Sequence, residues 1–395
     1  SAKQTLGAER WLAEHPKRVF LDRTCTIPFP FELPPPEERQ VHCVIVANGS
    51  AEACQAHVRG SSGSLIIRPS VRGDEHWPCE GTVPSPFTVG DINPNGSFVH
   101  VLNETALDVV MRELDTITDF AEYLSRKEAF VRSGKLAEAQ GEEDLVAFYA
   151  VRTDAEGEHD FVFEDAEAPI SIEPRLYQRI IEDPQYQAKK AADEISYIWD
   201  RLIENFSGHV LGGTSLTPEG HEFRLSDSEL SLRYMALVPR FVRRLLSQAI
   251  HDALQRGREV ERFVRSILHR PGTKGSETAF FVFTMRYPEW MDAAGGYERY
   301  REVRLRVTQI YAWGLLERHA HLERVIGIAL EPPGGGRGSS EDLVYAEQIE
   351  WTDQNRESIR EDCRAVGVLQ ELNERRFHAT EFPELGDGLI IIGPA

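Results

Sequence analysis

The sequence has few cysteines and no long apolar run. The five cysteines in 395 residues are Cys25, Cys43, Cys54, Cys79 and Cys363. A low and odd number of cysteines is typical of free thiols in a reducing compartment, so we expect a cytoplasmic protein. No stretch approaches 18 consecutive apolar residues and no signal peptide is visible at the start, so we expect no membrane partner.

Several catalytic motifs are also missing. The chain lacks the Gly-x-x-x-x-Gly-Lys-Ser/Thr of a P-loop, a Gly-x-Gly-x-x-Gly after a strand, a Gly-x-Ser-x-Gly elbow and a His-Glu-x-x-His. A nucleophilic Cys-His pair stays open, because such partners meet in space and not in sequence.

Basic residues are outnumbered, since the formal net charge is −20. A uniformly acidic surface repels nucleic acid and anionic lipid. Residues 224–274 are an exception, with eleven Lys and Arg against five Asp and Glu. Nucleic acid therefore remains a candidate partner through a local basic region, beside a protein partner or a homo-oligomer.

Apolar and polar patterns predict an α/β protein, with a mixed α+β arrangement as the alternative. Apolar runs predict strands at 18–21, 41–49, 64–70, 98–102, 160–164, 279–287, 324–330 and 343–351. Apolar residues at helical spacing predict helices at 4–13, 103–131, 186–206, 297–317 and 353–369, and a largely helical stretch at 225–268 that Pro239 kinks or divides. Strands that alternate with helices favour an α/β layer.

The same patterns predict two α/β domains with a helical region between them. We expect an N-terminal α/β domain at 1–150, a mainly helical and Arg-rich region at 151–274, and a C-terminal α/β domain at 275–395. Pro271-Gly272 ends the helical stretch and marks the preferred boundary.

Acidic residues in the segment MRELDTITDFAEYL are the candidate catalytic group. Asp115 and Asp119 are four apart and Asp115 and Glu122 seven apart, so on one helix they share a face. Carboxylates on one face can hold Mg²⁺ or Mn²⁺, or act as acid and base. The alternative is an ordinary solvated face.

Two Cys and His pairs form a candidate zinc site, with zinc the less expected cofactor. Cys54 and His57 are three apart, and His76 and Cys79 repeat the spacing in reverse order. Thiolate and imidazole ligands in two such pairs resemble a tetrahedral zinc framework. The alternative is a buried structural Cys54 and an exposed His76.

Arginines between residues 233 and 244 are candidates for binding phosphate or an acidic partner. Arg233, Arg240 and Arg244 fall at helical spacing, and Arg243 lies beside them. Arginines on one face bind phosphate or carboxylate in a bidentate manner. The alternative, favoured by the net charge of −20, is pairing with the chain's own carboxylates.

The first fifty residues resemble the later half of a restriction-endonuclease-like nuclease core. A helix (SAKQTLGAERWL), a strand (RVFLD) and a second strand (VHCVIVANG) carry the resemblance, and Gln4 takes the place of the Gln that the family's helix often bears. The family's metal-binding strands carry Glu-x-Lys, which occurs nowhere in this chain, so the resemblance places them upstream of Ser1. No catalytic residue is carried over.

The resemblance implies a bacterial nuclease-like protein, or a catalytically incomplete relative, that acts on nucleic acid in defence or repair. Two other hypotheses stand beside it. One is a non-enzymatic protein-interaction or scaffold protein, and the other is a zinc-stabilised binding protein.

Overall fold

The computed structural model divides the chain into two compact units, one up to Ala188 and the other from Lys189 to Pro383. It describes residues 2–58, 61–77, 85–155, 157–162, 168–212, 225–334, 340–348, 350–370 and 377–383. The architecture is mixed α/β, which confirms the expected fold class. Residues 151–188 of the expected helical middle region belong to the first unit and residues 189–274 to the second.

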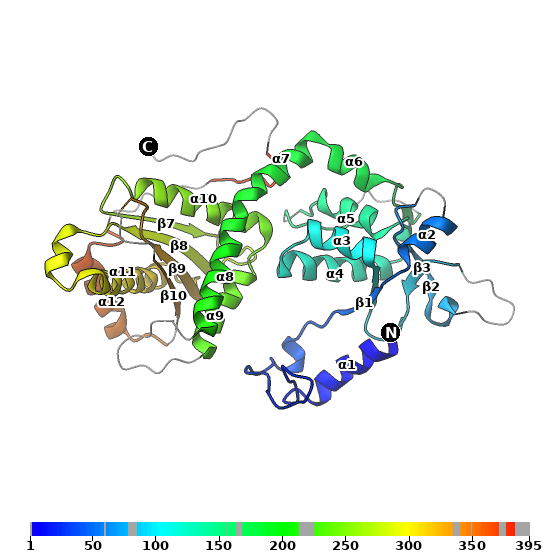
Figure 1. Ribbon diagram of the computed structural model, residues 1–395, viewed down its shortest axis with the longest axis horizontal. Helices are drawn as coiled ribbons and strands as arrows, with labels where there is room; N and C mark the ends of the chain where they lie inside the picture. Colours follow the sequence, from blue (N-terminus) through cyan, green and yellow to red (C-terminus); the bar gives the residue numbers. More distant parts are fainter. Residues whose placement is uncertain are drawn as a thin grey trace. The chain divides into compact units, whose positions relative to one another are not determined.

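Pairs of parallel strands form the framework of the first unit (Figure 1). Strand β1 (Cys43–Ala47) pairs with β4 (Val99–Asn103), β2 (Ile66–Arg72) with β3 (Thr88–Asp91), and β5 (Leu136–Glu138) with β6 (Ile170–Ser171). A bridge between Ile67 and Ala139 connects β2 to the end of β5.

Helices complete the first unit. They are α1 (Ala2–Glu14), η1 (Pro36–Glu38), α2 (Ala51–His57), η2 (Gly73–His76), α3 (Glu104–Glu113), α4 (Ile117–Arg132), α5 (Glu142–Ala150) and α6 (Leu176–Glu182). Helix α7 (Pro184–Asp193) leads into the second unit. The largest core cluster joins α3, α4 and α5, with Val110, Leu124, Phe130 and Leu145 at its centre.

The single helix expected at 103–131 is wrong, because the chain forms two helices there. Leu114 ends α3 with a non-helical backbone, and Thr116 caps α4 by accepting a hydrogen bond from the backbone N–H of Asp119. The apolar spacing continues across the break, so periodicity alone does not show it. Thr116 supplies the local signal, because Thr favours the N-cap position.

One four-stranded sheet forms the centre of the second unit, in the order β10-β9-β8-β7. The strands are β7 (Arg262–Leu268), β8 (Thr278–Met285), β9 (Arg324–Leu330) and β10 (Glu341–Glu347). Strands β8 and β9 are parallel and the two outer pairings are antiparallel. Pro271 and Gly272, the expected domain boundary, lie in the connection between β7 and β8.

Helices cover both faces of this sheet (Figure 1). One face packs against α8 (Tyr197–Leu211), α9 (Leu225–Ala236) and α10 (Arg240–Arg256), through residues such as Trp199 and Phe280. The other face packs against α11 (Gly296–Arg318) and α12 (Asp353–Val366), through Phe281 and Tyr311. Two short helices, η3 (Glu194–Ser196) and η4 (Glu289–Ala293), complete the unit. Every residue of β8 is buried, as a strand covered on both faces requires.

Two other expected elements differ in the structure, and a third lies partly outside the described residues. Residues 262–268 are strand β7 and not helix, because the fully buried β8 needs a hydrogen-bonding partner on that side. The strand expected at 18–21 is reduced to a bridge between Phe20 and Pro28. The strand expected at 160–164 lies partly outside the described residues. No described helix is long and apolar enough to cross a membrane.

Candidate binding surface

The candidate carboxylates do not share one helix. Asp115 lies in the connection between α3 and α4, whereas Asp119 and Glu122 lie in the first two turns of α4. Asp119 accepts a hydrogen bond from the Thr116 hydroxyl at 2.6 Å. Burial raises the pKa of Tyr149, and the charges of Glu122 and Asp119 raise it further, so these two carboxylates lie near that phenol.

The candidate zinc ligands are engaged by the protein itself where the structure describes them. The Cys54 thiol is fully buried, contacts the carbonyl oxygen of Ser64 at 3.2 Å, and has its pKa raised by burial. The Nε2 atom of His76 accepts from the N–H of Gly90 at 3.0 Å, so Nδ1 donates to the carbonyl of Gly73 at 2.9 Å. His57 is exposed beside Phe87, and Cys79 lies outside the described residues.

No group of three or more His, Cys, Asp or Glu side chains in the described part of the chain is placed to hold a metal ion.

The candidate arginines pair with carboxylates of their own unit. This is the alternative to phosphate or partner binding that the net charge favours. Arg240 and Arg243 both donate to Asp200, and Arg244 donates to Asp193 at 3.1 Å. All three arginines are buried residues, with exposed fractions of 9%, 6% and 3% in that order. Arg233 pairs with Glu229 one turn earlier on α9. Arg240, Arg243 and Arg244 thus connect α10 to α8 and to the end of α7.

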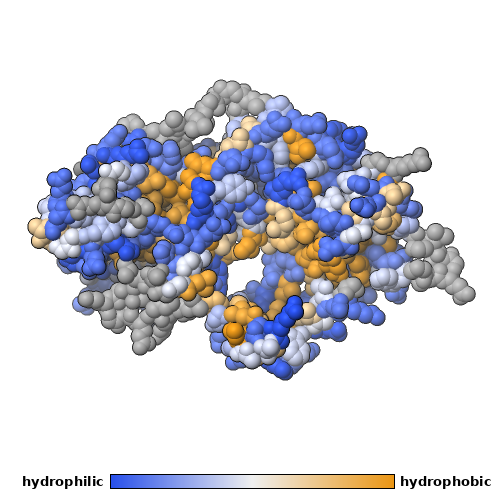
Figure 2. All heavy atoms as spheres, viewed as in Figure 1, coloured by the Kyte–Doolittle hydropathy of each residue, from blue (hydrophilic) through white to orange (hydrophobic). Residues whose placement is uncertain are grey.

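The N-terminal segment, residues 2–42, contains no buried residue. Its large apolar side chains lie at the surface, with exposed fractions of 45% for Trp11, 62% for Leu21 and 53% for Ile27. Figure 2 shows one small apolar patch at the lower edge of the view, among mostly hydrophilic residues of this segment.

Strand β1 follows this segment and, among the described strands, pairs on one side only. Its sole described partner is β4, although its sequence CVIVA is as apolar as a buried central strand. Val46 has 39% of its surface exposed, whereas Leu102 on β4 has none. An apolar edge strand without a charge or a proline presents unpaired backbone groups to a further strand.

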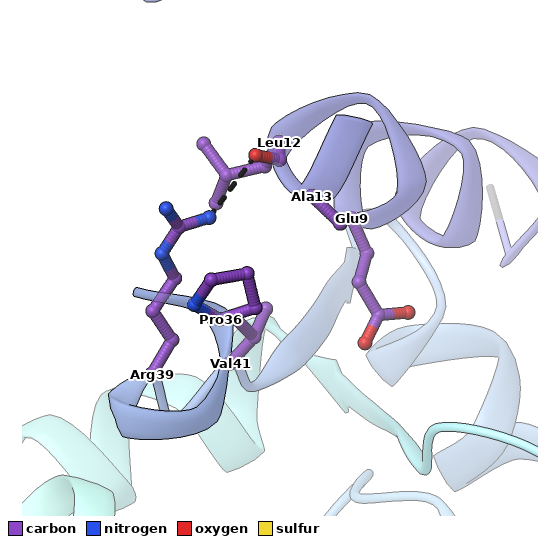
Figure 3. A pocket seen from close by; sticks show the side chains of 6 residues that line it. All are labelled: Glu9, Leu12, Ala13, Pro36, Arg39 and Val41. Atoms are coloured by element: carbon purple, nitrogen blue, oxygen red, sulfur yellow. Dashed lines mark hydrogen bonds between the residues drawn. The ribbon is translucent and has the colours of Figure 1, made fainter. Parts of the chain in front are cut away.

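An open pocket of about 230 Å³ lies between α1 and the residues that lead into β1 (Figure 3). Its walls are apolar at Leu12, Ala13, Pro36 and Val41, and the charged side chains of Glu9 and Arg39 are at its rim. Arg39 is held in place by donating to the carbonyl of Leu12 at 3.2 Å. Glu9 accepts a hydrogen bond from the Ser97 hydroxyl at 2.6 Å.

This surface is electrically neutral in an acidic protein. The first fifty residues contain six Lys and Arg and six Asp and Glu, so the whole excess of negative charge lies in the rest of the chain. We refer to the N-terminal segment and β1 together as the N-terminal surface.

Sequence patterns predicted β1 but not its position at an edge. A continuous apolar run is typical of a strand buried on both faces, and the run alone does not show how many strands pair with it. No family model, curated protein or solved structure matches the chain.

Proposed function

We propose that this chain is a protein-interaction protein that binds an extended segment of a partner protein as an added strand beside β1. The observation that carries the proposal is the apolar strand β1, which has one described neighbour and a 39% exposed Val46. Backbone hydrogen bonds supply affinity in this mode of binding, and pockets for alternate side chains supply specificity.

The proposed partner segment is basic. The net charge of −20 attracts a basic protein over a distance, and the neutral N-terminal surface does not oppose its final approach. The pocket at the start of β1 fits one side chain of the segment, with an apolar stem against Leu12 and Val41 and a charged end near Glu9.

A nuclease-like function stays a hypothesis that the geometry supports less. Its basic face was expected at residues 224–274, and Arg240, Arg243 and Arg244 in that region are buried in ion pairs. Phosphate binding by these three arginines requires the pairs to break, which leaves Asp193 and Asp200 without these partners.

A selection of displayed peptides on the whole chain tests the proposal. Val46→Lys is the test variant, because its exposed side chain accommodates a lysine and a charge on an edge strand blocks strand addition. Met111→Lys, at a 50% exposed position of α3, is the matched control. Thermal melting confirms that both variants fold.

We expect the selected peptides to be basic and to protect the amides of residues 43–47 from hydrogen exchange. Their affinity should fall by about tenfold or more, ~1.4 kcal/mol, in Val46→Lys and stay unchanged in Met111→Lys. The proposal is wrong if bound peptides leave the exchange of β1 unchanged, or if Val46→Lys binds them as well as the control does.

A further inference from the structure

A buried polar network lies at the carboxyl ends of the parallel strands β8 and β9. Helix α11 connects these strands, so its first turns lie at the same end of the sheet. Ligands of open α/β sheets bind at this end of parallel strands. Neither the apolar pattern nor any motif of the sequence indicates the network.

Arg304 is the centre of the network and has no exposed surface. It donates to Asp342 at 2.8 and 2.7 Å and to the hydroxyl of Ser340 at 2.8 Å. Tyr297, two turns earlier on α11, contacts the same hydroxyl at 2.8 Å and donates to Glu331 at 2.6 Å. The network therefore ties α11 to the ends of β9 and β10.

Two buried polar atoms of the network have no hydrogen-bond partner in the part of the chain that the structure describes. One is Oε1 of Glu331, a side chain with only 7% of its surface exposed, and the other is Nε of Arg301. Pro332 and Pro333 follow Glu331 directly and have no N–H to offer it. A buried acceptor and a buried donor left without partners each cost free energy, which a ligand with the opposite groups recovers.

We propose that Glu331 and Arg301 bind a small zwitterion that carries an ammonium and a carboxylate close together, as a free α-amino acid does. The ammonium donates to Glu331, and the carboxylate accepts from Arg301.

The charges around the site favour a neutral zwitterion over a simple ion. Asp342 faces both Arg304 and Arg301, at 2.7 and 3.3 Å, and Glu331 adds the second negative charge. Two arginines and two carboxylates sum to zero, so a lone cation or anion leaves a net charge in a buried place. The rings of Tyr287, Tyr297 and Tyr300 pack together at centroid distances of 5.2 to 6.0 Å beside these groups and offer apolar contact to a side chain.

The test measures the melting temperature of the whole chain with free α-amino acids, with an alkylamine and with a simple carboxylate. The test variants are Glu331→Gln and Arg301→Gln. Glu323→Gln and Arg299→Gln are their matched controls, because both side chains are largely exposed and form ion pairs at the surface, with Arg324 and Glu302.

We expect at least one α-amino acid to raise the melting temperature of the wild type, whereas the amine and the carboxylate alone do not. Both test variants should lose the shift and both controls should keep it. Without ligand, Glu331→Gln should melt at or above the wild-type temperature, because it removes a buried charge that makes no direct ion pair with either arginine among the described residues.

Three outcomes would overturn the proposal. They are no shift with any amino acid, a shift that survives in both test variants, and a ligand-free Glu331→Gln that melts below the wild type. The last outcome would show that the Glu331 carboxylate stabilises the fold and is not held ready for a ligand. Failure here leaves the proposal for β1 standing, because the two sites lie in different units.

Discussion

His100 lies in strand β4 with 1% of its surface exposed, and neither of its ring nitrogens has a hydrogen-bond partner. Its ring packs edge-on against Phe98 at 4.8 Å. Burial, and then the charges of Lys127, His42 and Arg132, together lower the pKa of His100 to about 2. The imidazole is therefore neutral in the folded protein at every ordinary pH.

This depressed pKa makes stability depend on pH. The unfolded chain binds a proton at His100 below a pKa of about 6.5 and the folded chain does not, so the stability is complete above that pH and is lost as the pH falls. We expect His100→Phe to keep the contact with Phe98 and to remove this loss. Between pH 7 and pH 5.5 the wild type should lose about 1 kcal/mol more than the variant.

Urea titrations of both proteins at the two pH values measure the difference, and other titrating groups cancel in the comparison. Equal losses in the two proteins would show that His100 is protonated in the folded state.

The junction of α3 and α4 depends on one side chain. Thr116 is buried, accepts from the N–H of Asp119 at 3.1 Å and caps α4 where the apolar spacing alone favours a continuous helix. We expect Thr116→Ala to cost about 1 kcal/mol of unfolding free energy, because the first turn of α4 loses its cap. Thr116→Ser is the control, since it keeps the hydroxyl, and chemical denaturation measures both. A Thr116→Ala variant as stable as Thr116→Ser would mean that the cap contributes nothing.

The central strand β8 of the second unit could be predicted from its sequence alone. Its continuous apolar run is a local pattern typical of a buried strand. Strand β7 could not be predicted, because its residues become a strand only through pairing with β8. The pairing of Arg301, Arg304 and Glu331 with their neighbours depends in the same way on contacts between distant segments, which periodicity does not encode.

At the scale of the whole molecule, the two units have separate cores. Phe130 stacks on Phe161 at 4.6 Å in the first unit, and Phe281 packs over Gly327 and against Tyr311 in the second. Gly327 is required there, because a Cβ at this position would lie 2.2 Å from the Phe281 ring. Each core lies on its own side of the division at residue 188, which was not visible in the composition of the chain.

Truncating either phenylalanine should therefore loosen its own unit first. We expect Phe281→Ala to cost about 3–5 kcal/mol through the cavity that it leaves, and to speed hydrogen exchange in β8 and β9 with little change in α4. Phe130→Ala is the matched variant and should reverse the pattern. Hydrogen exchange measured by mass spectrometry resolves the two units. If either variant speeds exchange equally on both sides of residue 188, the two cores belong to one cooperative structure and the division has no energetic meaning.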